Sequence, residues 1–314
     1  MYIENQLALF EDNQQKLLAH KNWTDSKITI LTLAIAGSVG SKQINNKQFF
    51  ADVNWIKEQS GWFSTIRNQP YIQYVYAHYM QGDKKVYNRI IQNKKYLDQH
   101  KLKHAIYSHL AAPLLLNGQE QKQASAAREL YRAGAKKQIF LTSGNDISTL
   151  VVLAGRYINS PFEEMSITVR LYYDELRKEN FSLGNNLQTM AQFLLWQSPT
   201  YVDHLVTYCK AIRLHLEQLG VVIKSSMYPF IAILALKQVK DHELETVVDN
   251  FFAIRGNFNL SWQPAHAFYM AVQCFLNTCV IQNEEHQSLN QLLTSYMLCT
   301  IGGQTIISQQ NLQH

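Results

Sequence analysis

An apolar residue followed by alanine recurs seven times along this chain of 314 residues, each time inside a short and strongly apolar stretch. Successive alanines lie 41, 35, 42, 37, 44 and 36 residues apart, so the spacing stays close to one value. Longer and more charged stretches separate the apolar ones. A repeat of this length, alternating an apolar helix with an amphipathic one, is typical of stacked helical hairpins that bury one another's apolar faces. The pairs are Ile35/Ala36, Tyr76/Ala77, Ala111/Ala112, Leu153/Ala154, Met190/Ala191, Leu234/Ala235 and Met270/Ala271.

This repeat predicts an all-α fold of about seven stacked helical hairpins with a period near 40 residues, either an α-solenoid or an α/α superhelix. Hydrophobic residues make up 46% of the sequence and charged residues 17%, which excludes a disordered chain and provides a large core. No stretch alternates apolar and polar residues as a half-buried strand would. We expect one helical-repeat domain over residues 1–303, followed by a short polar tail over residues 304–314.

Two further patterns support paired helices. Met165, Val169, Tyr172 and Leu176 recur at helical steps after Ser160-Pro161, which predicts an outer amphipathic helix beginning there. A shift of 79 residues aligns a second set of positions, which suggests that a unit of two hairpins was duplicated. The aligned positions include Leu97 with Leu176, Leu102 with Phe181, and His109 with Gln188.

Catalytic and cofactor motifs give no positive signal. The sequence has no glycine-rich phosphate loop, no Gly-x-Ser-x-Gly elbow and no His-Glu-x-x-His, and we predict no cofactor. The longest purely apolar run, Phe230 to Leu236, is far shorter than the roughly 20 residues of a membrane span. The four cysteines sit in apolar stretches without Cys-x-x-Cys spacing, so we expect buried, reduced thiols and a cytoplasmic protein. They are Cys209, Cys274, Cys279 and Cys299.

Three polar clusters precede apolar helices at comparable repeat positions, namely residues 63–67, 141–146 and 184–188. Helix N-termini expose unpaired N–H groups and partial positive charge, so aligned helix starts could form a surface that binds carboxylates or phosphates. The simpler interpretation is that Ser64, Ser143, Asp146 and Asn185 are N-caps, each contributing about 1 kcal/mol to helix stability. Arg67 and Gln188 are harder to explain as caps and are the preferred contacts.

Histidine and lysine provide weaker candidates. His100, His104 and His109 are close in sequence, but no cysteine or acid completes a metal-ligand set, so we predict no metal site. His109 remains a candidate ligand contact. Residues 84–103 carry seven Lys and Arg, faced only by Asp83 and Asp98, and form a basic strip that could bind a phosphate-rich partner. A solvated outer helix face explains this strip more simply, so a nucleic-acid partner is unlikely.

The polar clusters resemble a known family. Phe63 to Arg67, Leu141 to Asp146 with the following Leu150 to Ala154, and Gly184 to Gln188 with Met190-Ala191 resemble bacterial domain-of-unknown-function family 4003. The resemblance covers nearly the whole chain. It implies a bacterial cytosolic protein, and it implies no activity, ligand or catalytic residue.

Three functional hypotheses follow. The leading one is a non-enzymatic binding or scaffold module for a protein or peptide partner, using a concave surface near Arg67, His109, Asp146, Asn185 and Gln188. The alternative is an enzyme on a closed α/α toroid, with acid/base chemistry near Asp146 and a second acid beside it. The second alternative is nucleic-acid binding through residues 84–103.

Overall fold

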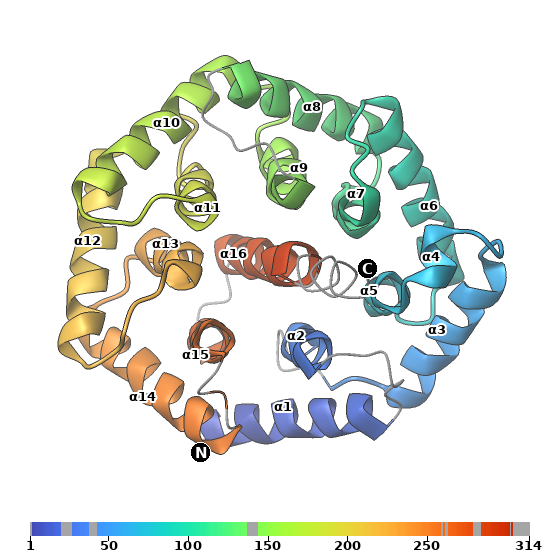
Figure 1. Ribbon diagram of the computed structural model, residues 1–314, viewed down its shortest axis with the longest axis horizontal. Helices are drawn as coiled ribbons and strands as arrows, with labels where there is room; N and C mark the ends of the chain where they lie inside the picture. Colours follow the sequence, from blue (N-terminus) through green and yellow to red (C-terminus); the bar gives the residue numbers. More distant parts are fainter. Residues whose placement is uncertain are drawn as a thin grey trace, which may run out of the picture.

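The computed structural model describes residues 2–19, 27–37, 43–136, 144–258, 260, 263–278, 284–301 and 303. These residues form α-helices and short 3-10 or π segments without a strand, so the predicted all-α fold is confirmed for this part of the chain. The helices form two concentric layers around a central helix (Figure 1). Residues 304–314, predicted to be a polar tail, and Cys279 lie outside the described residues.

The two layers alternate along the chain (Figure 1). The outer helices are α1 (Tyr2–Ala19), α3 (Asn46–Gln59), α6 (Lys84–Gln99), α8 (Glu120–Lys136), α10 (Phe162–Lys178), α12 (Asp203–Gln218) and α14 (Asp241–Asn257). The inner helices are α2 (Lys27–Gly37), α5 (Pro70–Met80), α7 (Ala105–Ala111), α9 (Ile147–Arg156), α11 (Asn185–Leu194), α13 (Tyr228–Leu236) and α15 (Pro264–Thr278). The short elements are α4 (Thr65–Asn68), η2 (Ala112–Leu114), η3 (Gly144–Asp146) and η4 (Ser225–Met227). The central helix α16 (Glu284–Ser295) continues into the π-helical η5 (Tyr296–Ile301).

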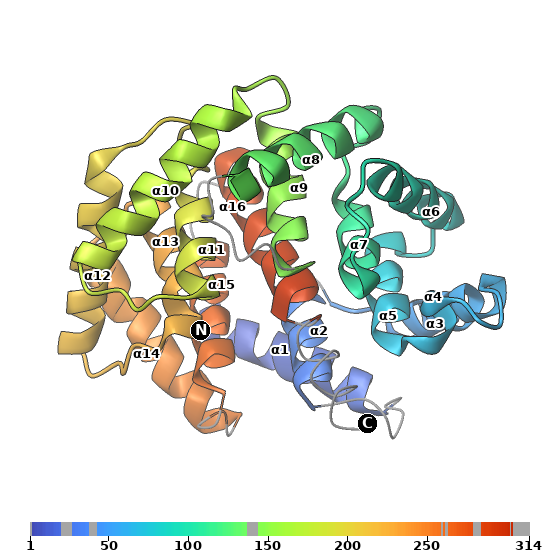
Figure 2. The same ribbon diagram turned by 45° about the horizontal axis from the view of Figure 1, so that its top comes forward.

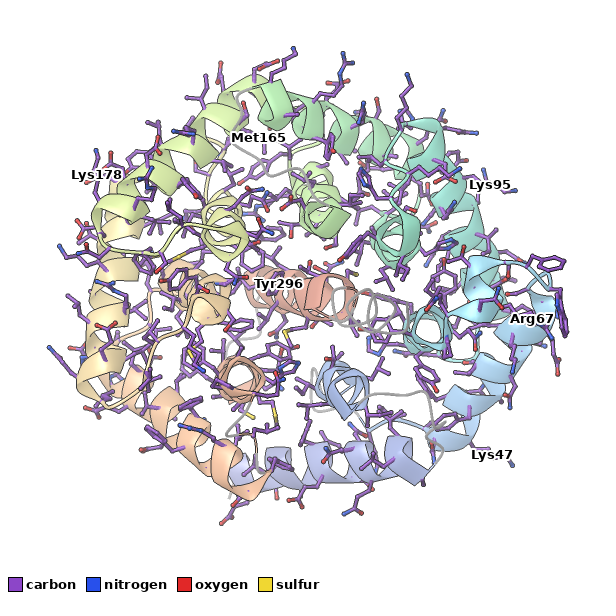
Figure 3. All side chains as sticks on the ribbon, in the orientation of Figure 1. Lys47, Arg67, Lys95, Met165, Lys178 and Tyr296 are labelled. Carbon is purple, nitrogen blue, oxygen red and sulfur yellow. The ribbon has the colours of Figure 1, made fainter. Side chains whose placement is uncertain are left out.

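Burial explains why the two layers differ in sequence. The seven apolar residue–alanine pairs are buried in the inner layer, where small alanine side chains allow close approach between neighbouring elements. All nine residues of α13 are buried, because this helix is covered on every side. Outer helices bury one stripe only. In α10 that stripe includes Met165, Val169, Tyr172 and Leu176, as their spacing predicts, whereas Lys178 points outward (Figure 3).

The first and last hairpins meet, so the arrangement is a closed ring (Figures 1 and 2). Phe10 of α1 packs edge-to-face on Phe258, which follows α14, with ring centroids 4.6 Å apart. In the inner layer, Thr32 Oγ1 of α2 lies 3.5 Å from His266 Nε2 of α15. The stack therefore has no open concave arc along these residues.

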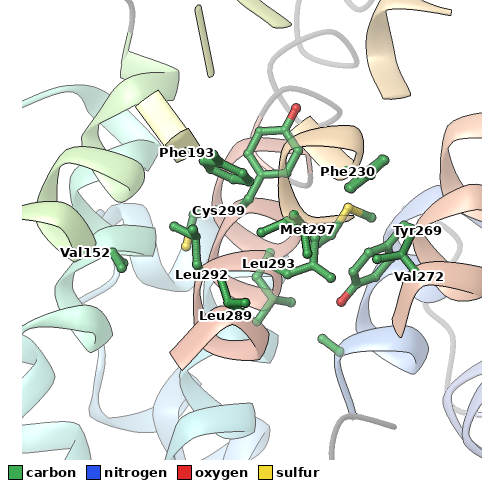
Figure 4. Close-up of a cluster of buried hydrophobic side chains, with 14 of the residues drawn as sticks. Val152, Phe193, Phe230, Tyr269, Val272, Leu289, Leu292, Leu293, Met297 and Cys299 are labelled. Carbon is green, nitrogen blue, oxygen red and sulfur yellow. The ribbon is translucent and has the colours of Figure 1, made fainter. Parts of the chain in front are cut away.

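The centre of the ring is filled by the chain itself. Leu289, Leu292, Leu293 and Met297 of α16 and η5 are almost inaccessible to solvent. They pack among side chains of the inner helices, including Val152, Phe193, Phe230 and Tyr269 (Figure 4). The predicted concave side is thus occupied by the apolar face of α16 and by η5.

One turn motif recurs where an outer helix leads to an inner one. Lys101, Asn180 and Gly220 have φ of 59°, 63° and 86°, a left-handed conformation. The residue after each donates its N–H to a carbonyl five residues back, as in a Schellman motif. These bonds run from Leu102 N to Leu97 O, Phe181 N to Leu176 O and Val221 N to Leu216 O, at 2.9, 3.2 and 2.9 Å. The first two are the positions that the 79-residue shift aligns.

We expect Gly220→Ala to lower the free energy of unfolding by about 1 kcal/mol, because a Cβ disfavours the left-handed conformation. The matched control is Gly256→Ala near the end of α14, where φ is not in the left-handed range and no atom lies near an added Cβ. This control should stabilise the protein by up to about 1 kcal/mol, since alanine favours helix. Urea denaturation of both variants measures the difference, and equal effects of the same sign would contradict the assigned turn.

Candidate functional site

The starts of several inner helices converge on η5 at the centre of the ring. Tyr71 Oη at the start of α5 donates to the carbonyl of Leu298 at 2.7 Å. Ser148 Oγ in the first turn of α9 lies 3.2 Å from Thr300 Oγ1. Tyr296, near the ring centre in Figure 3, donates to Asn186 Oδ1 in the first turn of α11 at 3.5 Å. This end of the inner layer is therefore polar where it meets the C-terminal turn.

Asp146 is the charged centre of this region. It ends η3, directly before α9, and only 6% of its surface is exposed. Gln188 Nε2 and Gln192 Nε2, both from α11, lie 3.2 and 3.3 Å from Asp146 Oδ1 and donate to it. These charge-assisted hydrogen bonds compensate for burying the carboxylate. We call Asp146, Gln188 and Gln192 the central cluster.

The carboxylate of Asp146 contributes to raised pKa values of two tyrosines. Burial, followed by the charge of Asp146, raises the pKa of Tyr107 to about 12. Burial and then Asp146 also raise the pKa of Tyr296. Both hydroxyls thus stay protonated across the physiological range and can act as neutral donors. The region offers one carboxylate, amides and neutral hydroxyls, a set suited to hydrogen bonding.

A second buried acid beside Asp146, which the toroid-enzyme hypothesis requires, is absent from the described residues. Among them, the buried acids are Asp52 and Asp146. Asp52 lies in α3, where its carboxylate accepts bonds from Gln48 Nε2 at 2.9 Å and from the N–H of Gly82 at 2.8 Å. Asp52 therefore holds the turn after α5 and does not pair with Asp146.

The structure brings Asp146 and Gln188 together and places Asn185 differently from the expectation. Asn185 is the first residue of α11, and Gly184 occupies the cap position, so Asn185 is not an N-cap. The Asn185 carbonyl accepts a bond from Thr189 Oγ1 at 3.0 Å. Ser64 does cap α4, accepting from the N–H of Arg67 at 3.1 Å. Residues 141–143, including Ser143, lie outside the described residues.

Arg67 does not join the central cluster. It lies at the outer edge of the ring in Figure 3. Its Nη1 donates to the carbonyl of Lys57 at 3.0 Å and weakly to that of Ser60 at 3.4 Å, which satisfies carbonyls at the end of α3. Its guanidinium also lies 4.9 Å from the ring centroid of Trp62. The predicted common surface of Arg67 with Asp146 and Gln188 is therefore wrong.

His109 lies in α7, where its Nδ1 is 3.0 Å from Tyr76 Oη of α5. Burial, assisted by the charge of Lys94 and opposed by Asp98, lowers the pKa of His109 to about 4. A neutral, hydrogen-bonded imidazole between two inner helices serves packing. The described residues contain no group of three His, Cys, Asp or Glu side chains that could hold a metal ion.

The buried histidines make stability depend on pH. His266 in α15 is 4% exposed, and burial lowers its pKa to about 4 from an ordinary value of 6.5. Between these pH values the unfolded chain binds a proton that the folded chain excludes, so stability is lost as pH falls through this window. The slope reaches at most about 1.4 kcal/mol per pH unit for each such histidine.

We therefore expect His266→Gln to flatten the decline in unfolding free energy between pH 6.5 and 4, as measured by urea denaturation at successive pH values. The same replacement at exposed His242 of α14 is the control and should leave the decline unchanged. A decline that His266→Gln does not alter would contradict the burial of a neutral imidazole at this position.

For Asp146 we expect a contrast between two substitutions. Asp146→Leu leaves the buried amides of Gln188 and Gln192 without their shared acceptor and should cost about 2 kcal/mol of unfolding free energy. Asp146→Asn keeps an acceptor oxygen and should cost less than about 1 kcal/mol. Chemical denaturation distinguishes them, and a cost for Asn as large as that for Leu would show that the negative charge itself, and not only an acceptor oxygen, is required.

Two adjacent aromatic side chains are exposed, which the sequence did not predict. Trp62 and Phe63 are 72% and 91% exposed, the latter the most exposed of the large hydrophobic side chains described. They lie in the connection between α3 and α4, residues 60–64, which we call the aromatic loop. The sequence signal was the presence of two aromatic residues in an otherwise polar connection. It does not predict their exposure, because exposure depends on whether other elements of the fold cover the connection.

The basic strip lies on the outer layer. Lys85, Arg89 and Lys95 of α6 are exposed, and Lys95 points away from the ring in Figure 3. Lys94 instead pairs with Asp98 one turn later. Lys84 Nζ lies 5.1 Å from the ring centroid of Trp55 in α3. The exposed cations therefore lie on the outer face of this helix, and Lys84 and Lys94 are engaged locally.

Three of the four cysteines lie in the described residues and are buried free thiols, as their apolar surroundings predict. They are Cys209, Cys274 and Cys299, and burial raises the pKa of each, that of Cys274 to about 12. They are thus unreactive at neutral pH.

In the described part of the chain, no helix combines the length and apolar character needed to cross a bilayer.

Comparison with known proteins places the chain in a family. Neither curated proteins nor solved structures give a significant match to the sequence. A family model described as "Protein of unknown function (DUF4003)" matches residues 13–310, which is nearly the whole chain and includes every region that carries the resemblance. The chain therefore belongs to the DUF4003 family.

Proposed function

We propose that this protein is a non-enzymatic binding or scaffold module that engages a protein partner through its aromatic loop. The ring supplies a rigid support, and the exposed aromatic pair supplies the contact. This moves the expected binding surface from the centre of the ring to its outer edge, because α16 fills the centre.

The observation that carries the proposal is the exposure of Trp62 and Phe63 on a loop that is held in place. Exposing two adjacent large aromatic side chains is unfavourable unless a partner covers them. Tryptophan and arginine dominate the energetic hot spots of protein interfaces, and Arg67 lies against the Trp62 ring. The loop therefore has the residue types that are typical of the centre of a protein interface.

Local hydrogen bonds order the loop before any partner arrives. Arg67 binds carbonyls at the end of α3, and Ser64 caps α4. Gln73 Nε2 of α5 donates to the carbonyls of Ile66 and Arg67 at 2.8 and 3.0 Å, which ties α4 to the inner layer. A preordered loop loses less conformational entropy on binding, so more of the contact energy appears as affinity.

Acid/base catalysis is less well supported. Ring closure meets one condition of the toroid-enzyme hypothesis, but its second condition was a carboxylate pair. Asp146 is surrounded in the described structure by the amides of Gln188 and Gln192, and Asp52 serves another turn. One carboxylate held by amide donors is suited to positioning α9 against α11.

Site-specific photo-crosslinking in the native host tests the proposal. A photoreactive amino acid at position 63 should yield one dominant crosslinked protein, and adding Trp62→Ser should abolish it. The matched control places the same amino acid at Phe252, which is 42% exposed on α14 and lacks an aromatic neighbour exposed beside it. No crosslink at position 63, or the same products at both positions, would refute the proposal.

A further inference from the structure

We infer that the partner presents an acidic segment with an apolar anchor, which binds across the aromatic loop and the outer face of α6. The inference rests on the proposed function and adds the chemical class of the partner. Its basis is the placement of uncompensated positive charge beside the exposed aromatic pair.

The aromatic loop and α6 are neighbours. Trp55 of α3 packs edge-to-face on Tyr87 of α6, with ring centroids 5.2 Å apart, and also contacts Lys84. The first turns of α6 therefore lie against the half of α3 that leads into the aromatic loop. Figure 1 shows the connection between α3 and α4 at the same outer edge of the ring as α6. One partner segment can reach both.

The charge in this region is strongly one-sided. Residues 46–103 contain ten Lys and Arg against four Asp and Glu. Three of these acids have local roles. Asp52 is buried and bonded, Asp98 pairs with Lys94, and Asp83 caps α6 by accepting from the N–H of Lys85 at 2.9 Å. Only Glu58 remains as an exposed acid without such a role in this part of the described chain.

The cations of α6 are available. Lys85, Arg89 and Lys95 are exposed, and no acid of the described residues lies within ion-pair distance of them. Such a surface attracts negative charge and sets the orientation of a partner more than it supplies affinity. The affinity then comes from an apolar side chain against Trp62 and Phe63. The exposed cations and the aromatic pair together favour a partner segment in which acidic residues flank an apolar one.

A protein segment fits this surface better than a phosphate polymer or an anionic membrane. Besides its cations, α6 exposes the side-chain amides of Asn88, Gln92 and Gln99. Side-chain amides both donate and accept hydrogen bonds, which matches a peptide backbone. A nucleic-acid surface favours a denser run of cations, because affinity grows with the number of phosphates neutralised.

Fluorescence anisotropy with defined probes tests the inference. The probe is a short fluorescein-labelled peptide rich in Asp and Glu that contains two phenylalanines. One comparison peptide replaces the acids by Asn and Gln, and another replaces the phenylalanines by Ser. We expect the probe to bind roughly tenfold more tightly than either comparison peptide, and to weaken as salt is raised.

Variants of the protein locate the site. Lys85→Glu, Arg89→Glu and Lys95→Glu together, and separately Trp62→Ser with Phe63→Ser, should each weaken probe binding by roughly tenfold. The control is a triple charge reversal elsewhere on the ring, which changes net charge equally and should leave binding nearly unchanged. Its exposed positions are Arg177, Lys224 and Lys240.

The outcomes separate the two proposals. Equal binding of the acidic and neutral peptides, or an equal loss in the control triple variant, overturns the acidic-partner inference. So does tighter binding to phosphatidylglycerol vesicles or to oligothymidylate than to the acidic peptide. If the crosslink at position 63 persists in the α6 charge-reversal variant, the inference fails and the proposed function stands. If no crosslink forms at position 63, the proposed function fails.

Discussion

Leu293→Ala is expected to lower the free energy of unfolding by about 2–5 kcal/mol, the usual cost of creating a cavity in a packed core. Leu293 lies in α16, is fully inaccessible to solvent, and is surrounded by inner-layer side chains in Figure 4. The lost methyl groups cannot be replaced by rearrangement of one neighbour, because helices on several sides of the ring form the site. Equilibrium denaturation in urea measures the change.

The matched control is Leu214→Ala in α12, where the side chain is 41% exposed. This variant should lose less than about 1 kcal/mol, because a large part of the removed surface already contacts water and no enclosed cavity is left behind. If the unfolding free energies of the two variants differed by less than about 1 kcal/mol, α16 would not pack into the centre of the ring.

The second large effect concerns ring closure. Phe10→Ala should cost about 3–5 kcal/mol, because Phe10 is buried at the joint between the first and last hairpins. The substitution removes the edge-to-face contact with Phe258 and leaves a cavity between α1 and α14. The substitution should also accelerate amide hydrogen exchange in α1, because this helix would lose its contact with the end of the last hairpin.

Phe252→Ala on α14 is the control for this prediction, since it removes the same group from a half-exposed position. Its expected cost is below about 1.5 kcal/mol. If Phe10→Ala were no more destabilising than Phe252→Ala, the first and last hairpins would not be in contact in solution, and the ring would be open.

The repeat made the inner layer predictable, because each apolar residue–alanine pair needs cover on several sides and only paired helices provide it. Ring closure was not predictable in the same way. Closure depends on a small rotation at each hairpin that accumulates around the ring, and no single residue encodes that rotation. The position of α16 followed neither from period nor from composition, since its burial requires the central space that closure creates.

The central cluster was partly predictable. Asp146 and Gln188 both belong to the polar clusters that precede successive inner helices α9 and α11, so their contact follows from the repeat. Arg67 breaks this equivalence, because it lies within the additional short helix α4, which precedes α5 and places Arg67 at the outer edge. The exposure of Trp62 and Phe63 could not be predicted, since an aromatic residue in a connection can point into the core or away from it.

Hydrogen exchange of α16 in the isolated full-length protein tests the central claim most directly, namely that the ring is closed around its own C-terminal helix. The account predicts that amides of residues 289–298 exchange as slowly as those of inner helix α13, because both are enclosed by the same core. Exchange of these amides as fast as in the connection at residues 60–64 would contradict it, and would return the binding surface to the centre of the ring.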